Sequence, residues 1–260
     1  MSAAQVHPTA LVHPAARLAE GVSVGAFSII GEQVTVGEGT WIGSHVVIEG
    51  RTRIGRGNRI HSFSALGGTP QDKKYADEDT AVEIGDGNTL REYVTVNRGT
   101  VHDARVTRIG DDNWVMAYVH VAHDCQVGSH AIFANACQLA GHVHIGDWAI
   151  LGGATLVHQF VRVGAHSFTG MGACLGQDLP PYVKAAGCMA KPFGINSEGL
   201  RRRGFPEDVI GRIKRAYRTL YRSSLSLADA TRELGAQSAD CREVGAFLDF
   251  LSNSKRGFIR

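Results

Sequence analysis

The sequence predicts an all-β parallel solenoid over residues 1–190, followed by a small α-helical domain over residues 191–260. Aliphatic residues recur every six positions through most of the first part, and small residues recur four positions after them. The last part of the chain shows the period of amphipathic helices instead. A period of six fits neither a helix nor a long strand, but it fits a short strand and a turn that repeat.

The first run of hexads has no gap from its first residue to its last. Its members are Val6, Val12, Leu18, Val24, Ile30, Val36, Ile42, Ile48, Ile54, Ile60 and Leu66. A later run extends from Ile109 to Leu175, and only Thr169 is polar in it. We expect these side chains to fill the interior of stacked coils, because each coil of a solenoid covers the apolar core of its neighbours. An antiparallel sandwich is not expected to give so regular a repeat.

Two breaks in the hexads predict loop inserts at residues 67–83 and 97–108. The first insert is long for a connection, and such loops are usually functional or disordered. Its polar side chains Gln71, Asp72 and Lys74 can reach a neighbouring surface.

The C-terminal part predicts about three packed helices. Pro180 and Pro181 should end the solenoid, because proline lacks the backbone donor that a sheet needs. Ser226 with Asp229 is typical of a helix cap, and Asp240 is the expected cap of a further helix. The residues expected to face inward are Ile210, Ile213, Tyr217, Leu220, Tyr221, Leu227, Ala230, Leu234, Val244, Phe247, Leu248 and Leu251.

Charge and cysteine content restrict the class of protein. Residues 191–260 hold 14 Lys and Arg against 8 Asp and Glu, which predicts either an anionic ligand or partner or only a solvated helical surface. No apolar stretch approaches the ~20 residues of a membrane span, and no secretory signal is evident. The five cysteines show no CxxC pair, so we expect free thiols and a cytoplasmic location.

A group of histidines carries the candidate chemistry. If three hexads form one coil, the chain returns to the same place every eighteen residues, one rung of ~4.8 Å further along. Gly141 follows His123 by eighteen residues, so the two should be neighbours. A neutral imidazole suits a general base, Asp124 or another carboxylate can orient it, and the N–H of Gly141 can stabilise an oxyanion.

Metal binding is the alternative for this group. Histidines that converge between subunits bind zinc in the hexapeptide-repeat carbonic anhydrases. Here His120 and His123 are three residues apart, and side chains on a strand alternate between its two faces. We therefore expect neither a metal nor another cofactor.

Six segments give the chain a family resemblance over essentially its whole length. They are Gln-Asp-Lys-Lys-Tyr at 71–75, Thr-Val-Asn-Arg-Gly-Thr at 95–100, His-Val-Ala-His-Asp-Cys at 120–125, Leu-Ala-Gly-His-Val at 139–143, Val-His-Gln-Phe at 157–160 and Asn-Ser-Glu-Gly-Leu-Arg-Arg-Arg-Gly-Phe at 196–205. With them the chain resembles the acyl-carrier-protein:UDP-N-acetylglucosamine O-acyltransferases, the first enzymes of lipid A biosynthesis. The last segment is more specific than the hexads, which many acyltransferases share.

The resemblance implies a left-handed β-helix, a homotrimer and active sites between subunits. It implies transfer of an (R)-3-hydroxyacyl group from acyl carrier protein to the 3-hydroxyl of UDP-N-acetylglucosamine, without a nucleic-acid partner. His123 matches the general base, Asp124 its support and Gly141 the oxyanion donor. Substrate contacts are implied for Gln71, Asp72, Lys74, His120, His142, His158 and Gln159, and nucleotide contacts for Asn196, Glu198, Arg202 and Arg203.

Met171 matches the residue that sets acyl-chain length in this family, which is glycine in members that use longer chains. A thioether would occupy the space of the last methylenes. Since each buried methylene contributes roughly 0.8 kcal/mol, we expect a preference for about ten carbons over about fourteen.

Three other functions compete with this one. The related N-acyltransferase of the same pathway usually has a further N-terminal domain, whereas the hexads begin here at Val6. An acetyl-CoA acetyltransferase that binds no nucleotide is disfavoured by the segment 196–205. A purely structural or binding solenoid would need no group of histidines.

Overall fold

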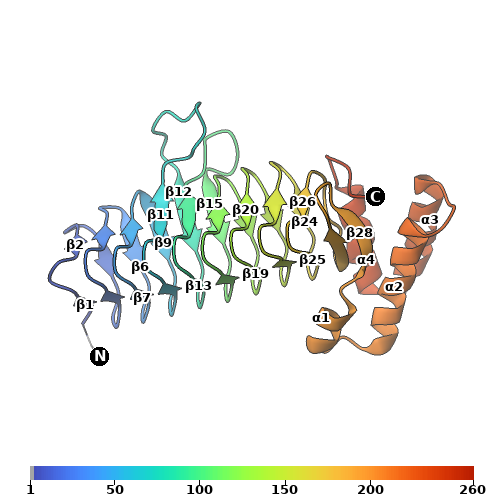
Figure 1. Cartoon of the computed structure of the whole chain (residues 1–260), viewed down its shortest axis with the longest axis horizontal. Helices are drawn as coiled ribbons and strands as arrows, with labels where there is room; N and C mark the ends of the chain where they lie inside the picture. Colours follow the sequence, from blue (N-terminus) through green and yellow to red (C-terminus); the bar gives the residue numbers. More distant parts are fainter. Residues whose placement is uncertain (1–2) are drawn as a thin grey trace.

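The protein forms a long three-sided prism of short strands with helices at its C-terminal end (Figure 1). The structure is a computed structural model that describes residues 3–260. Three sheets run along the prism, here named sheets A, B and C, and each complete coil adds one strand to each sheet. The chain passes from A to B to C and back to A, so the prism has corners AB, BC and CA.

The strands of each sheet are as follows. Sheet A contains β1 (Gln5–Val6), β4 (Ser23–Val24), β7 (Trp41–Ile42), β10 (Arg59–Ile60), β13 (Thr89–Leu90), β16 (Trp114–Val115), β19 (Ile132–Phe133), β22 (Ile150–Leu151), β25 (Phe168–Thr169), β27 (Val183–Ala186) and β28 (Lys191–Ile195). Sheet B contains β2 (Leu11–Val12), β5 (Ile29–Ile30), β8 (Val47–Ile48), β11 (Ala65–Gly68), β14 (Thr95–Asn97), β17 (His120–Val121), β20 (Gln138–Leu139), β23 (Leu156–Val157) and β26 (Cys174–Leu175). Sheet C contains β3 (Arg17–Leu18), β6 (Val34–Val36), β9 (Arg51–Ile54), β12 (Ala81–Ile84), β15 (Val106–Ile109), β18 (Gln126–Val127), β21 (His144–Ile145) and β24 (Arg162–Val163).

The pairing of the strands agrees with the predicted coil of three hexads. Gln126 pairs with His144, and His144 with Arg162, in parallel and at intervals of eighteen residues. The interior is aliphatic, as the hexads predict, with side chains such as Ile48 and Leu139 fully buried. Thr169, the polar exception, is also buried, and its hydroxyl lies 2.8 Å from the hydroxyl of Thr155.

The N-terminal end of the core is open, which the hexads alone did not predict. Val6 is 42% exposed, and Val12 and Leu18 are partly exposed, because no described coil covers them. Burial of the marked side chains becomes complete only from the second coil, at Val24 and Ile30.

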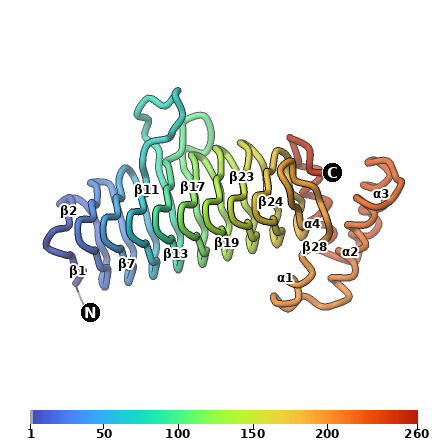
Figure 2. Tube along the Cα trace, in the orientation of Figure 1, coloured from blue at the N-terminus to red at the C-terminus, as the bar shows by residue number. Residues whose placement is uncertain are grey.

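Both predicted loop inserts leave the prism at corner BC, on neighbouring coils (Figures 1 and 2). The first connects β11 to β12 and the second connects β14 to β15. Strand pairing extends into the predicted inserts at both ends, so the loops themselves span residues 69–80 and 98–105. The guanidinium of Arg98, in the second loop, lies 5.9 Å from the ring centre of Tyr75 in the first.

The solenoid continues past the two prolines, which corrects their predicted role. β27 still pairs in parallel with β25, and β28 then turns back and pairs antiparallel with β27. Pro180 and Pro181 are tolerated because they lie in the turn before β27, where the chain needs no ladder donor at their positions.

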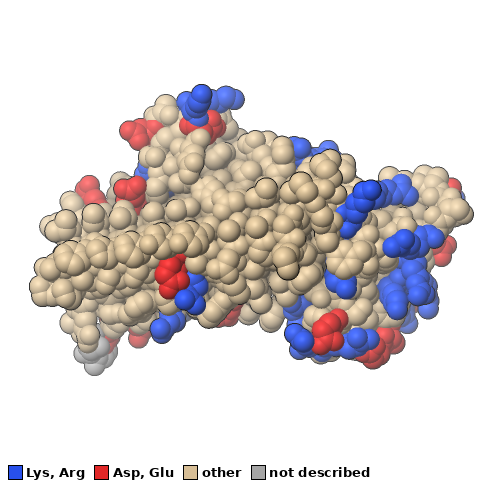
Figure 3. All heavy atoms as spheres, viewed as in Figure 1, with Lys and Arg blue, Asp and Glu red and all other residues tan. Residues whose placement is uncertain are grey.

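The helices are α1 (Ser197–Arg202), α2 (Glu207–Tyr221), α3 (Leu227–Ser238) and α4 (Arg242–Ser252). Ser226 caps α3 by accepting from the N–H of Asp229, as predicted, but the residue that precedes α4 is Cys241 rather than Asp240. Tyr221 and Leu248 are only partly buried, and Leu227 is exposed. Lys and Arg side chains gather over this end (Figure 3). No helix within residues 3–260 has both the length and the apolar character needed to cross a membrane.

Candidate active site

The predicted base lies at corner BC, in the turn between β17 and β18. Here the chain places the same turn on successive coils, with Asp124, His142 and Phe160 each in the left-handed region of backbone conformation. The N–H of His142 donates to the carbonyl of His123 over 3.0 Å, and the N–H of Phe160 donates to the carbonyl of Gly141 over 3.1 Å. The turns are thereby stacked, so residues far apart in sequence line one surface.

His123 and Asp124 form a hydrogen-bonded pair. Nδ1 of His123 lies 2.9 Å from Oδ2 of Asp124, and both residues are buried. An ionised carboxylate can only accept, so Nδ1 is the donor and Nε2 carries the free lone pair. This geometry leaves Nε2 able to take a proton from a substrate hydroxyl.

Asp124 is itself held by its neighbours. The N–H of Thr100 donates to both carboxylate oxygens over 3.0 Å, and the Thr100 hydroxyl donates to Oδ2 over 2.7 Å. The N–H of Asp124 donates to the hydroxyl of Thr107. Burial alone would raise the pKa of Asp124, but the hydrogen bonds from His123 and Thr100 outweigh it and hold the pKa below its usual value.

Gly141 lies against the imidazole of His123, as the spacing of eighteen residues predicted. A Cβ built on Gly141 would lie 2.5 Å from Cε1 and 2.6 Å from Nε2 of His123. Only glycine leaves the space that the ring occupies. The backbone of Gly141 therefore borders the atom that is free to act as a base.

A second histidine packs against the first. The ring of His142 stands edge-on to that of His123, with centres 4.9 Å apart, and it stacks on Phe160 with centres 4.5 Å apart. Its Nδ1 lies 2.6 Å from Oδ2 of Asp103, and its Nε2 lies 3.9 Å from Oδ2 of Asp124. The corner thus holds two adjacent pairs of imidazole and carboxylate.

A groove of about 410 Å³ extends from this corner along the outer face of sheet B. His120 and His158 line it together with apolar side chains such as Leu156 and Met189. Nδ1 of His120 lies 2.7 Å from the hydroxyl of Thr95. Burial lowers the pKa of His120, and the nearby His123 lowers it further. An apolar groove that ends near a base suits a substrate with a hydrocarbon chain.

The other predicted site residues near this corner are less tightly placed. Gln71, Asp72 and Lys74 lie in the protruding loop 69–80, where Asp72 accepts from the N–H of Lys74 over 3.0 Å. Gln159 follows His158, whose Nδ1 lies 3.2 Å from the Gln159 carbonyl. Met171 lies at corner AB before β26, 86% exposed, and is not among the residues that line the groove.

The four residues of the segment 196–205 lie at a different corner. Arg203 donates to the carbonyl of Trp148, which is in a turn of corner CA, and its guanidinium lies 5.2 Å from the Trp148 ring centre. Asn196 caps α1 by accepting from the N–H of Gly199. Glu198 and Arg202 are exposed and pair with each other over 3.0 Å. One chain alone therefore does not bring these residues together with His123.

Three residues at the site were not predicted from the sequence: Thr100, Asp103 and Thr107. All three lie within or beside the second insert. The insert lengthens its coil, so the eighteen-residue interval that located Gly141 does not apply across it. Thr100 does belong to one of the six segments, but nothing in the spacing indicates that it reaches Asp124.

His123, Asp124 and His142 are close enough to share a metal ion, since one ligand atom from each lies within 4.8 Å of the others. The hydrogen bonds described above already satisfy the Asp124 carboxylate, however, and they orient it toward His123 and Thr100. The donor set thus fits an oriented base better than a metal site.

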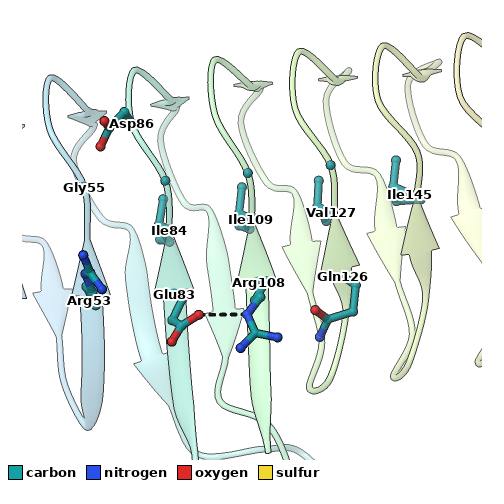
Figure 4. Close-up of a pocket in the computed structure, with 13 residues that line it drawn as sticks. Arg53, Gly55, Glu83, Ile84, Asp86, Arg108, Ile109, Gln126, Val127 and Ile145 are labelled. Carbon is teal, nitrogen blue, oxygen red and sulfur yellow. Dashed lines mark hydrogen bonds and ion pairs between the residues drawn. The ribbon is translucent and has the colours of Figure 1, made fainter. Parts of the chain in front are cut away.

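A separate hollow of about 540 Å³ lies on the outer face of sheet C (Figure 4). Both of its carboxylates are paired: Glu83 contacts Arg108 over 2.8 Å, and Asp86 contacts Arg56 over 3.4 Å. No histidine, cysteine, serine or lysine lines it. The hollow therefore offers no free base or nucleophile.

Comparison with known proteins agrees with this architecture. The family model described as "Udp N-acetylglucosamine O-acyltransferase; Domain 2" matches residues 178–259, and the bacterial transferase hexapeptide model matches residues 33–68 and 107–141. The acyl-[acyl-carrier-protein]--UDP-N-acetylglucosamine O-acyltransferases of Halorhodospira halophila and Herminiimonas arsenicoxydans are 56% and 54% identical to this chain, and the alignments cover 98% of this chain and 99% of each relative.

Solved structures give the same result. LpxA from Acinetobacter baumannii is 42% identical with a TM-score of 0.95, over 98% of this chain and 99% of that one. The UDP-N-acetylglucosamine acyltransferase of Arabidopsis is 33% identical with a TM-score of 0.84, over 98% of this chain and all (100%) of that one. The predicted left-handed parallel β-helix with a small helical C-terminal part is confirmed. The chain belongs to the family of acyl-[acyl-carrier-protein]–UDP-N-acetylglucosamine O-acyltransferases.

Proposed function

We propose that this protein transfers an (R)-3-hydroxyacyl chain from acyl carrier protein to the 3-hydroxyl of UDP-N-acetylglucosamine, the first step of lipid A biosynthesis, with His123 as the general base. The observation that carries the proposal is the buried pair of His123 and Asp124, which leaves Nε2 of the imidazole free beside an apolar groove. The names of relatives that align over nearly the whole chain support the substrates.

The reaction follows from this geometry in two steps. Nε2 of His123 takes the proton of the sugar hydroxyl as its oxygen attacks the thioester carbonyl, and Asp124 stabilises the resulting imidazolium. The N–H of Gly141 hydrogen-bonds the tetrahedral oxyanion. The carbon–sulfur bond then breaks, the carrier thiolate takes the proton from His123, and the ester product remains.

We place the complete site between chains of a homotrimer. Corner BC carries His123 and the groove, whereas corner CA carries Arg203, the residue that follows α1. These are different edges of one prism, so the nucleotide contacts implied for α1 require a second chain. The arginines suit a diphosphate through charge-assisted hydrogen bonds. The free thiols favour a reducing compartment, the cytoplasm.

The test is an acyl-transfer assay with UDP-N-acetylglucosamine and 3-hydroxyacyl thioesters of acyl carrier protein. Wild-type protein should form the ester, and His123→Ala should lower kcat by about a hundred- to ten-thousandfold while the protein remains folded. His13→Ala is the matched control, because His13 is an exposed histidine in a corner BC turn of the first coil, far along the prism from His123. Full transfer by folded His123→Ala would contradict the assignment of the base.

A further inference from the structure

The contact between Asp103 and His142 has no assigned task in the reaction described above. Oδ2 of Asp103 lies 2.6 Å from Nδ1 of His142, a distance typical of a charge-assisted hydrogen bond. The His142 side chain is 11% exposed and that of Asp103 is 45% exposed. The carboxylate therefore approaches a largely buried ring from the solvent side.

Stacking alone does not fix how His142 presents its nitrogens. The ring lies nearly parallel to that of Phe160, with an interplanar angle of 17°. A half-turn about the Cβ–Cγ bond would preserve this stack but exchange Nδ1 with Cδ2 and Nε2 with Cε1. Only a directional partner distinguishes the two orientations, and Asp103 is that partner. Its hydrogen bond keeps Nε2, rather than a carbon, toward Oδ2 of Asp124.

One short loop supplies the anchors of both histidines. Thr100 and Asp103 both lie in the loop 98–105 between β14 and β15. Thr100 holds the carboxylate that orients His123, and Asp103 orients His142 directly. The second insert thus acts as a common support for the two imidazoles of corner BC.

We propose that Asp103 is a positioning residue for acyl transfer, which holds the His142 ring in one orientation, with Nε2 against the pair of His123 and Asp124 at the acceptor site. The inference rests on the proposed function and on the substrate contact that the family resemblance implies for His142. Because Nδ1–H is bound to Asp103, the ring presents one defined nitrogen, Nε2, at the corner where His123 lies.

Steady-state kinetics of three variants test this role. Asp103→Ala should lower kcat/KM for UDP-N-acetylglucosamine by about tenfold or more, the effect expected for a lost hydrogen bond to a charged group. The KM for the acyl carrier thioester should not change. Asp103→Asn should recover much of the loss, because the amide oxygen can still accept from Nδ1. Asp103→Ala added to His142→Ala should cause less than about a twofold further loss, since a residue that acts through His142 has no effect without it.

The matched control is Glu83→Ala. Glu83 also holds a cationic side chain, that of Arg108, over 2.8 Å, but it does so on the outer face of sheet C, so its removal should leave the kinetic constants unchanged. Unchanged kinetics of Asp103→Ala would overturn the proposal. So would an equal loss in the His142→Ala background, because Asp103 would then act by another route.

Nitrogen NMR of histidine-labelled protein gives a readout that does not depend on activity. The His142 signal, assigned by its absence in His142→Gln, should show a protonated Nδ1 in the wild type and lose that preference in Asp103→Ala. The same tautomer mixture in both proteins would overturn the proposal. A wild type that gives this NMR result but transfers no acyl group would instead contradict the proposed function.

Discussion

The hydroxyl of Thr100 donates to the carboxylate of Asp124 over 2.7 Å, although the two residues lie on different coils. This bond helps to keep the pKa of Asp124 below its usual value. A carboxyl group whose pKa is lower in the folded than in the unfolded chain stabilises the fold at pH values above its unfolded pKa of ~3.9. This stabilisation is lost as the pH falls through the folded pKa.

Thr100→Val should therefore destabilise the protein in a pH-dependent way. Valine keeps the shape and the backbone N–H but removes the hydroxyl, so the free energy of unfolding should fall by about 1.5–3 kcal/mol at pH 7. At an acid pH below the unfolded carboxyl pKa of ~3.9, the difference from wild type should narrow, because Asp124 loses its charge as the pH falls through its lowered folded pKa. Denaturant titrations at both pH values measure it, and an equal difference at both would show that the hydroxyl does not act through the charged carboxylate.

Gly141→Ala should lower acyl transfer much more than it lowers stability. The new Cβ would lie 2.5 Å from Cε1 of His123, so the imidazole must move away from the position in which Asp124 orients it. We expect kcat to fall by about a hundredfold or more, as for a misplaced general base. Gly211→Ala in α2 is the control, because open space surrounds its Cβ position. Normal turnover by Gly141→Ala would mean that His123 does not need its present position.

The sequence was most informative where its period was regular. The eighteen-residue interval located Gly141 beside His123 without any structural knowledge, because both precede the same kind of turn on successive coils. It did not find Asp103, since the irregular second insert has no fixed register relative to the coils. It also did not indicate that Val6 is exposed, because a repeat identifies which side chain points inward but not whether another coil covers it.

Two inactive variants should restore activity when their chains are mixed. His123 lies at corner BC and Arg202 in α1, which contacts corner CA through Arg203, so we expect one active site to take them from different chains. Co-expressed His123→Ala and Arg202→Ala chains should form some sites with both side chains intact. Activity should exceed that of either variant alone. As the control, His123→Ala mixed with Gly141→Ala should stay inactive, because both changes affect the same corner. Failure of the first pair to restore activity would place the whole site in one chain.

Met171→Gly should lengthen the preferred acyl chain. Met171 is 86% exposed at corner AB. Its thioether is therefore free to contact a second copy of the chain, whose apolar groove is one such surface. Each methylene that gains or loses burial changes binding by roughly 0.8 kcal/mol, so excluding three or four of them would change relative kcat/KM by about a hundredfold or more. Turnover of thioesters with about ten and about fourteen carbons, measured for both proteins, tests this. The wild type should favour the shorter chain and Met171→Gly the longer one. A wild type that already favours the longer chain would exclude Met171 as the limit of the groove.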